Sequence, residues 1–304
     1  MPDPRQIPII CGPTASGKTS LALRLAQQLP IEIVSADSRQ VVKYLNIGTA
    51  KPTEEEQRTV AFHLLDLIEP GERYSAFRFI EDANTAIEGI LSRGHLPVVV
   101  GGTGLYLRAL TEGVVEIDAS DMAIREHLER EMAEVGPEAM HERLKEIDPI
   151  EASRVHANNK VRVIRALEIF YMTGKAKTQL TATGTHRKSD YSYKTYCIVP
   201  QREVLYDAID SRVDKMIAMG LFAETEQLIQ RGWKEKIRLA NIIGYNEILD
   251  FLDAKISLSE AVSLIKQNSR RYAKRQMTWF RHQTKATLYA DVDSALKDLQ
   301  CRPS

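Results

Sequence analysis

Residues 12–19 read Gly-Pro-Thr-Ala-Ser-Gly-Lys-Thr and match the Walker A pattern, G-x-x-x-x-G-K-[ST], at every fixed position. The apolar run Ile7–Cys11 precedes this segment, and leucines at helical spacing (Leu21, Leu25 and Leu29) follow it. The segment therefore lies between a buried strand and a helix, which is the context of a phosphate-binding loop. A chain that opens with strand, phosphate loop and helix is predicted to belong to the α/β class.

This loop, which is typical of ATP- and nucleotide-binding proteins, predicts a polyphosphate or diphosphate ligand. Backbone N–H groups and a helix N-terminus bind anionic oxygens, Lys18 adds a positive charge, and the Thr19 hydroxyl can ligate Mg²⁺, partly through water. The residues assigned to diphosphate binding are Gly12, Pro13, Thr14, Ala15, Ser16, Gly17, Lys18 and Thr19. An ATPase of this type also has an acid at the end of an apolar strand, but residues 98–104 read Val-Val-Val-Gly-Gly-Thr-Gly. The loop therefore leaves open both kinase-like transfer and departure of diphosphate as a leaving group.

The rest of the chain extends the α/β pattern and interrupts it once. Strand-like runs at 31–34, 96–100 and 194–199 alternate with helical patterns, which predicts a mostly parallel sheet. Residues 117–177 show only helical patterns, with a break at Gly136-Pro137, and helical patterns also fill the chain after residue 199. We predict a P-loop NTPase-like α/β core with a helical C-terminal part, and a helical insertion domain. The core is assigned to residues 1–114 and 191–304, and the insertion to residues 115–190.

Composition excludes several classes of protein. The 304 residues suffice for one large domain or two modest ones, and no apolar run approaches the length of a transmembrane helix. The N-terminus lacks the basic-then-apolar order of a signal peptide, and Cys11, Cys197 and Cys301 lie far apart, as expected of reduced thiols. We expect a cytoplasmic protein without a membrane partner or an obligate protein partner, and nothing in the sequence requires more than a monomer.

Charge is balanced over the whole chain but not along it. The chain has 41 Lys and Arg and 41 Asp and Glu, yet residues 152–189 hold eight Lys or Arg against one acid, Glu168. Residues 261–290 hold seven Lys or Arg and no acid. Two such regions indicate a polyanionic partner. The basic residues of the second region share one face of a helix: Lys266, Arg270, Arg271, Lys274, Arg275, Arg281 and Lys285. Trp279 and Phe280 fall on the opposite, apolar face and are interpreted as core.

Asp37 directly follows the second strand-like run. In an open parallel sheet, residues just beyond the carboxyl ends of the strands face the ligand crevice, so Asp37 is expected to share a crevice with Lys18. A carboxylate at this place can act as a general base or hold a metal, or it can merely cap a turn.

Seven motifs occur together in one order along the chain. They are Gly12–Thr19, Asp37–Gln40, Asn46–Pro52, Gly101–Tyr106, Arg162–Glu168, Gly244-Tyr245 and Lys274–Arg281. This combination, which extends over nearly the whole chain, closely resembles the bacterial tRNA dimethylallyltransferases, also called tRNA isopentenyltransferases. The resemblance implies transfer of a dimethylallyl group from dimethylallyl diphosphate to N6 of the adenosine 3′ of the anticodon, with release of diphosphate and a requirement for Mg²⁺. It further implies that the acceptors are tRNAs reading codons that begin with U, and that the insertion domain binds the anticodon stem-loop.

The same resemblance assigns roles to single residues. Asp37 matches the family's general base, Thr103 matches a threonine near the target base, and Lys18 belongs to the catalytic set. Arg212 resembles an arginine that reaches the diphosphate. The positions assigned to tRNA binding are Asp37, Ser38, Arg39, Gln40, Thr103, Arg125, Val161, Arg162, Arg165, Gly244, Tyr245, Lys274, Arg275, Gln276, Thr278, Trp279 and Arg281.

Two other functions fit parts of the sequence. A small-molecule P-loop kinase would use the same loop, but it leaves the basic C-terminal region unexplained. A non-catalytic RNA-binding NTPase switch would bind tRNA in a nucleotide-dependent way and form no modified nucleoside.

Overall fold

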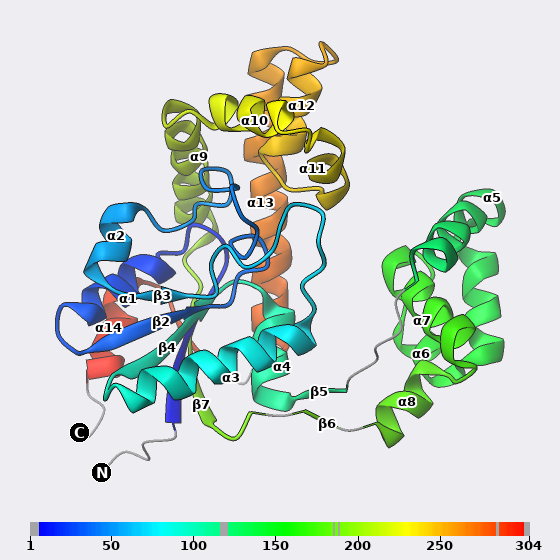
Figure 1. Cartoon of the computed structure of the whole chain (residues 1–304), viewed down its shortest axis with the longest axis horizontal. Helices are drawn as coiled ribbons and strands as arrows, with labels where there is room; N and C mark the ends of the chain where they lie inside the picture. The colour runs from blue at the N-terminus through cyan, green and yellow to red at the C-terminus, as the bar shows by residue number, and fades with distance from the viewer. Residues whose placement is uncertain (1–5, 116–120, 185, 188, 284–285, 301–304) are drawn as a thin grey trace. The chain divides into compact units, whose positions relative to one another are not determined.

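The computed structural model describes residues 6–115, 121–184, 186–187, 189–283 and 286–300 (Figure 1). The chain divides into two compact units, of which one comprises residues 1–112 and 188–304 and the other residues 113–187. The insertion expected from the sequence, 115–190, starts two residues later than the second unit and ends three residues later. Within the described residues, no helix has the length and apolar character needed to cross a membrane.

The first unit is built on a six-stranded sheet with the strand order β3-β2-β4-β1-β7-β8. Its strands are β1 (Gln6–Cys11), β2 (Ile31–Ser35), β3 (Phe62–His63), β4 (Leu96–Gly101), β7 (Ser192–Ile198) and β8 (Thr287–Tyr289). The described strand pairs of this sheet are all parallel, which confirms the predicted fold class. The sequence does not predict β3 and β8, because strands of two and three residues are too short for an apolar run or an alternation. The expectation of helices alone after residue 199 is therefore wrong at β8.

Helices cover both faces of the sheet. The connection from β1 to β2 runs through α1 (Lys18–Ala26), and the connection from β3 back to β4 runs through α3 (Ala76–Ser92). Because the two connections run in opposite directions along the sheet, right-handed crossovers place α1 and α3 on opposite faces (Figure 1). The C-terminal helix α14 (Val292–Gln300) packs beside α1. The core side of α3 follows the helical period, with Phe79, Ile80, Ala83, Ile87 and Ile90 fully buried.

The short helix α2 (Glu54–Thr59) directly precedes β3 and packs beside α1. The remaining helices of the first unit follow the carboxyl ends of β4 and β7 along the chain (Figure 1). They are α4 (Gly104–Glu112), α9 (Arg202–Ala218), α10 (Leu221–Gln230), α11 (Lys234–Ala240), α12 (Tyr245–Leu252) and α13 (Leu258–Gln283). The long helix α13 packs against α4, α9 and α12. It therefore connects the loops at the edge of the sheet with the helices that follow β7.

The second unit is helical and has its own core. It contains α5 (Met122–Ile147), α6 (Pro149–Arg154), α7 (Lys160–Thr173) and α8 (Lys177–Thr183), and β5 (Val114–Val115) pairs with β6 (His186–Arg187) in an antiparallel ladder. Gly136 takes a φ of 85° inside α5, directly before Pro137, which confirms the predicted break. Buried Leu128, Met132, Met140 and Leu144 of α5 belong to one apolar cluster with Val163 and Leu167 of α7.

Candidate active site

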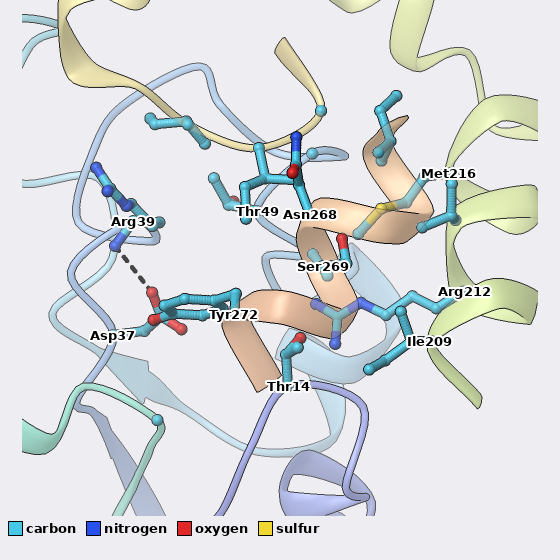
Figure 2. A pocket seen from close by; sticks show the side chains of 18 of the residues that line it. Thr14, Asp37, Arg39, Thr49, Ile209, Arg212, Met216, Asn268, Ser269 and Tyr272 are labelled. Atoms are coloured by element: carbon cyan, nitrogen blue, oxygen red, sulfur yellow. Dashed lines mark hydrogen bonds between the residues drawn. The ribbon is translucent and has the colours of Figure 1, made fainter. Parts of the chain in front are cut away.

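A cavity of about 470 Å³ lies at the carboxyl ends of β1, β2 and β4 (Figure 2). The P-loop and the start of α1 contribute Thr14 and Lys18 to its wall, and the segment after β2 contributes Asp37. Gly102 follows β4, and α9 contributes Arg212. This edge of a parallel sheet is where open α/β folds bind ligands.

One wall of the cavity is apolar. Ile209 and Val213 of α9 and Ile265 of α13 line it and are almost completely buried. Met216 lies one turn further along α9 and also faces the cavity (Figure 2). The cavity thus offers charged groups at one side and a surface for a small apolar group at another.

The P-loop is built for close approach of an anion. A Cβ atom at Gly12 would lie 2.3 Å from the carbonyl oxygen of Ile198, so only glycine fits there. Gly17 takes a φ of 89° immediately before α1. Ser16 Oγ is buried and has no hydrogen-bond partner in the described part of the chain. A buried hydroxyl without a partner inside a loop of this type is explained by a ligand that supplies one.

Lys18, Arg212 and Asp37 interact in the cavity, whose lining also includes Arg39, Arg271, Arg275 and Glu247. The pKa of Lys18 is lowered to about 8, chiefly because the surrounding protein removes the ammonium from water and further because the positive charge of Arg212 is near. Desolvation also lowers the pKa of Arg212, while the charge of Asp37 raises it. Lys18 Nζ donates to the Pro13 carbonyl at 2.6 Å. The positive charge in the cavity therefore exceeds the negative charge of Asp37, which favours an anionic ligand.

Thr103 ties the turn that carries Asp37 to the end of β4. The Ser38 backbone N–H donates to Thr103 Oγ1 at 2.9 Å, and the Thr103 N–H donates to the Ala36 carbonyl at 3.2 Å. The Arg39 N–H donates to Asp37 Oδ1 at 2.8 Å (Figure 2). Hydrogen bonds thus join the turn that contains Asp37 to Thr103, the second predicted catalytic residue. Lys18, the third, lines the same cavity as Asp37.

Gln276 joins α13 to both phosphate-side loops. Its Oε1 accepts from the Thr14 N–H at 2.8 Å, and its Nε2 donates to the Gly102 carbonyl at 2.9 Å. The sequence assigns Gln276 to tRNA binding, but only 7% of this residue is exposed and its amide is occupied inside the fold. Through these two hydrogen bonds, Gln276 fixes the P-loop and the loop at Gly102 relative to each other.

Tyr245 and Glu224 fix another wall of the cavity, the loop at residues 46–50. Glu224 accepts hydrogen bonds from the backbone N–H groups of Asn46 and Ile47, and its Oε1 also accepts from the Tyr245 hydroxyl at 2.6 Å. The Gly48 N–H donates to the Tyr245 hydroxyl at 3.2 Å. Tyr245 is fully buried, so its side chain is not on the surface where the sequence places a tRNA contact. Sequence reasoning misses Glu224, because a single glutamate on a helix carries no signal of its long-range partners.

Gln40 and Gly244, which the sequence also assigns to tRNA binding, both line the cavity. Gln40 Nε2 donates to the Ala50 carbonyl at 3.0 Å and so supports the same loop from its other side. Gly244 has a φ of 100°, and its N–H donates to Glu247 Oε2 at 2.8 Å.

Some cations on the basic face of α13 pair with acids of α9, and others are exposed to solvent. Arg270 NH1 contacts both carboxylate oxygens of Asp210, at 2.5 and 2.7 Å, and Lys266 Nζ lies 2.7 Å from Asp214 Oδ1. These two cations therefore pair with α9, so the basic face predicted from the sequence is not available as a whole to a polyanionic partner. The residues that remain exposed are Arg271, Lys274, Arg275, Thr278 and Arg281, whereas Lys285 lies outside the described residues.

Trp279 is half-buried over the start of α4. A Cβ atom at Gly104 would lie 2.5 Å from the Trp279 ring, so the indole lies directly against the glycine. Phe280 is buried, as the sequence predicts.

In the second unit, the residues assigned to tRNA binding lie on α5 and α7. Val161 and Arg162 are exposed in the first turn of α7, and Arg125 pairs with Glu129 on α5 at 2.9 Å. Arg165 NH1 donates to Glu168 Oε2 at 3.0 Å. Glu168 is completely buried, so one end of the Arg165 guanidinium is held from inside the unit.

Family models match this chain over most of its length. A model described as IPP transferase matches residues 40–283, and a second, described as isopentenyl transferase, matches residues 5–66. The chain is 46% identical over 275 residues to tRNA dimethylallyltransferase 1 of Pelobacter propionicus, covering 90% of this chain and 89% of that protein. It is 46% identical over 279 residues to the tRNA dimethylallyltransferase of Geobacillus thermodenitrificans, covering 91% and 88%.

Two solved structures are similar to this one. The full-length tRNA isopentenylpyrophosphate transferase of Bacillus halodurans is 40% identical, with a TM-score of 0.68 over 97% of this chain and 94% of that one. A eukaryotic dimethylallyltransferase acting on tRNA is 30% identical, with a TM-score of 0.75 over 91% of this chain and 70% of that one.

Proposed function

The chain belongs to the IPP transferase family, and we propose that it transfers a dimethylallyl group from dimethylallyl diphosphate to an adenosine of tRNA. The relatives described above are named as tRNA-modifying transferases, which favours this function over the kinase and over the RNA-binding switch. The acceptor that the motifs imply is N6 of the adenosine 3′ of the anticodon, in tRNAs that read codons beginning with U. We also propose that the reaction takes place in the cytoplasm, where its tRNA substrate is found.

The excess of positive charge in the cavity is the observation that carries this proposal. Lys18 and Arg212 both lose favourable hydration there, and Asp37 is the acid that partly balances them. A diphosphate bound between the P-loop and Arg212 would compensate both cations. Because the leaving diphosphate gains negative charge as its bond to carbon breaks, these cations stabilise the transition state more than the ground state.

The proposed transfer has a simple balance of bonds. The bond between the allylic carbon and the diphosphate oxygen breaks, and its electron pair leaves with the diphosphate. The N6 atom of adenine forms the new bond to that carbon, and its proton passes to the Asp37 carboxylate. Thr103 lies on the neighbouring strand end, bonded to the Asp37 turn, and we assign it to the placement of the target base. The apolar wall formed by Ile209, Val213 and Ile265 suits the branched hydrocarbon.

Mg²⁺ fits the P-loop side of this cavity. Thr19 lines the cavity with a hydroxyl group, and among the described residues no three His, Cys, Asp or Glu side chains cluster as a metal site. Mg²⁺ is commonly held by few protein ligands together with substrate phosphates and water, which matches this set of donors. Thr19 would hold the ion partly through water, and the ion would neutralise charge on the departing diphosphate.

We assign the binding of the anticodon stem-loop to the second unit together with exposed and partly exposed groups of the first. The second unit contributes Arg125, Val161, Arg162 and Arg165. The first unit contributes Asp37, Ser38, Arg39, Thr103, Lys274, Arg275, Thr278, Trp279 and Arg281. Gln40, Gly244, Tyr245 and Gln276 support the surfaces from which these residues act, through the hydrogen bonds described above.

Nucleoside analysis tests the proposed function. An unmodified tRNA is incubated with the protein, Mg²⁺ and dimethylallyl diphosphate, then digested, and its nucleosides are separated by mass. We expect an adenosine that is heavier by one dimethylallyl group, and no such product with Lys18→Ala. Turnover of ATP without any modified nucleoside would instead support the kinase or the switch.

A further inference from the structure

Leu239, in the last turn of α11, is the most exposed large apolar side chain in the described part of the chain, with 83% of the residue accessible. Val204 and Met219 follow in the first unit, at 60% each. A single exposed leucine is ordinary on a protein surface, so exposure alone does not indicate a function. The distinguishing feature of Leu239 is the way in which the chain holds it.

The end of α11 is bonded to the turn that carries Asp37. Arg39 NH1 donates to the Ala240 carbonyl at 3.1 Å, and the Arg39 N–H donates to Asp37 Oδ1 at 2.8 Å. Figure 2 shows Arg39 beside Asp37 at the wall of the cavity. Asn241 ends the helix with a φ of 47° and itself lines the cavity. Leu239 is therefore at the rim of the cavity, two residues from its wall.

The backbone beneath Leu239 is fixed from several sides. The Asn246 side-chain amide donates to the Arg238 carbonyl at 3.3 Å and to Asn241 Oδ1 at 2.9 Å. The Arg238 guanidinium pairs with Asp250 at 2.9 Å and with Asp253 at 3.0 Å. A helix end that is anchored in this way presents its exposed side chain in a defined place.

We propose that Leu239 is a wedge that enters the anticodon loop and occupies the space that the target adenosine leaves in the base stack. The inference rests on the proposed function. Asp37 lies in the cavity, so a base that remains stacked in the loop cannot reach it and must be extruded. Extrusion leaves a gap between the neighbouring bases, and proteins that unstack nucleic acid commonly fill such gaps with apolar side chains such as leucine. An exposed apolar side chain on an anchored backbone, two residues before a residue that lines the cavity, suits this role.

A fluorescent base measures the extrusion directly. An anticodon stem-loop RNA carries 2-aminopurine at the target position, where its fluorescence rises when the base leaves the stack. We expect a rise with the wild-type protein and with Leu239→Met, and a much smaller rise with Leu239→Ala. Leu29→Ala is the matched control, because Leu29 is also an exposed leucine but lies between the end of α1 and the start of β2, at the opposite edge of the sheet.

Single-turnover rates separate a wedge from a structural residue. On the natural stem-loop, Leu239→Ala should slow modification about tenfold, which corresponds to about 1.4 kcal/mol. On a stem-loop that is abasic on the 3′ side of the target, the base is less stacked, and Leu239→Ala should react at the wild-type rate. Equal fluorescence and rate for Leu239→Ala and Leu29→Ala would overturn the proposal, as would a defect that persists on the abasic RNA. If the wild-type protein modifies neither RNA, the proposed function itself fails.

Discussion

Replacing Tyr245 with phenylalanine separates a supporting role from direct contact with tRNA. Phenylalanine keeps the ring, which is fully buried and lies against Gly48, where a Cβ atom would be 2.4 Å from the ring. The substitution removes only the hydroxyl that donates to Glu224 Oε1 at 2.6 Å and accepts from the Gly48 N–H at 3.2 Å.

The magnitude follows from these two hydrogen bonds. The Gly48 N–H loses the Tyr245 hydroxyl as an acceptor but keeps a long contact to Glu224 Oε1 at 3.5 Å, so it is not left without an acceptor. Glu224 retains the N–H groups of Asn46 and Ile47, so its carboxylate is not left without donors. The main loss is one hydrogen bond to a charged group in a partly buried place, and we expect the free energy of unfolding to fall by about 2 kcal/mol. Since the loop lines the cavity, KM for dimethylallyl diphosphate should also rise by a few-fold.

Urea unfolding followed by tryptophan fluorescence measures this effect in the correct unit. The chain has two tryptophans, Trp233 and Trp279, and both belong to the first unit. Tyr44→Phe is the control, because Tyr44 is partly exposed and its ring contact with Trp233 survives the substitution. If Tyr245→Phe lowers the free energy of unfolding by less than about 0.5 kcal/mol, the supporting role is refuted, because an ordinary surface substitution causes a change of that size. Weakened tRNA binding at unchanged stability would show direct contact instead.

Three further predictions test the site. The affinity of the free enzyme for dimethylallyl diphosphate should fall as the pH rises through about 8, because an anion binds the protonated Lys18 whose pKa lies there, and titration calorimetry across this range measures it. Asp37→Asn should lower kcat by about 10² to 10⁴ while both substrates bind within a few-fold of wild type, as single-turnover and binding assays would show. Replacing Lys274 and Arg281 with alanine should weaken tRNA binding. It should also reduce the magnitude of the slope of log affinity against log salt concentration by about 2. Arg270→Ala should leave that slope unchanged, because Arg270 pairs with Asp210; a slope that falls with Arg270→Ala would contradict this pairing.

The sequence predicts the parts of this site that depend on local order along the chain. The P-loop follows from the fixed spacing of its glycines and Lys18, and the position of Asp37 follows from its place directly after a strand. A helical wheel also finds the basic face of α13, but it cannot tell which cations meet a partner. Lys266 and Arg270 are four residues apart, as are Asp210 and Asp214, and only the packing of α13 against α9 brings the two pairs together.

Charges buried elsewhere in the first unit are satisfied within the protein, and this contrast locates the function. Glu32 accepts from Arg93, His63 and His95, and the hydrogen bond from Arg93 is the main reason that its pKa is lowered to about 2. Glu224 likewise has several donors. The cavity differs, because there desolvation lowers the pKa of Lys18, and Ser16 Oγ has no partner among the described residues. The first unit satisfies its other buried charges but leaves positive charge and a hydroxyl without a described partner together in one cavity, so this cavity is arranged for an anion that binds from outside.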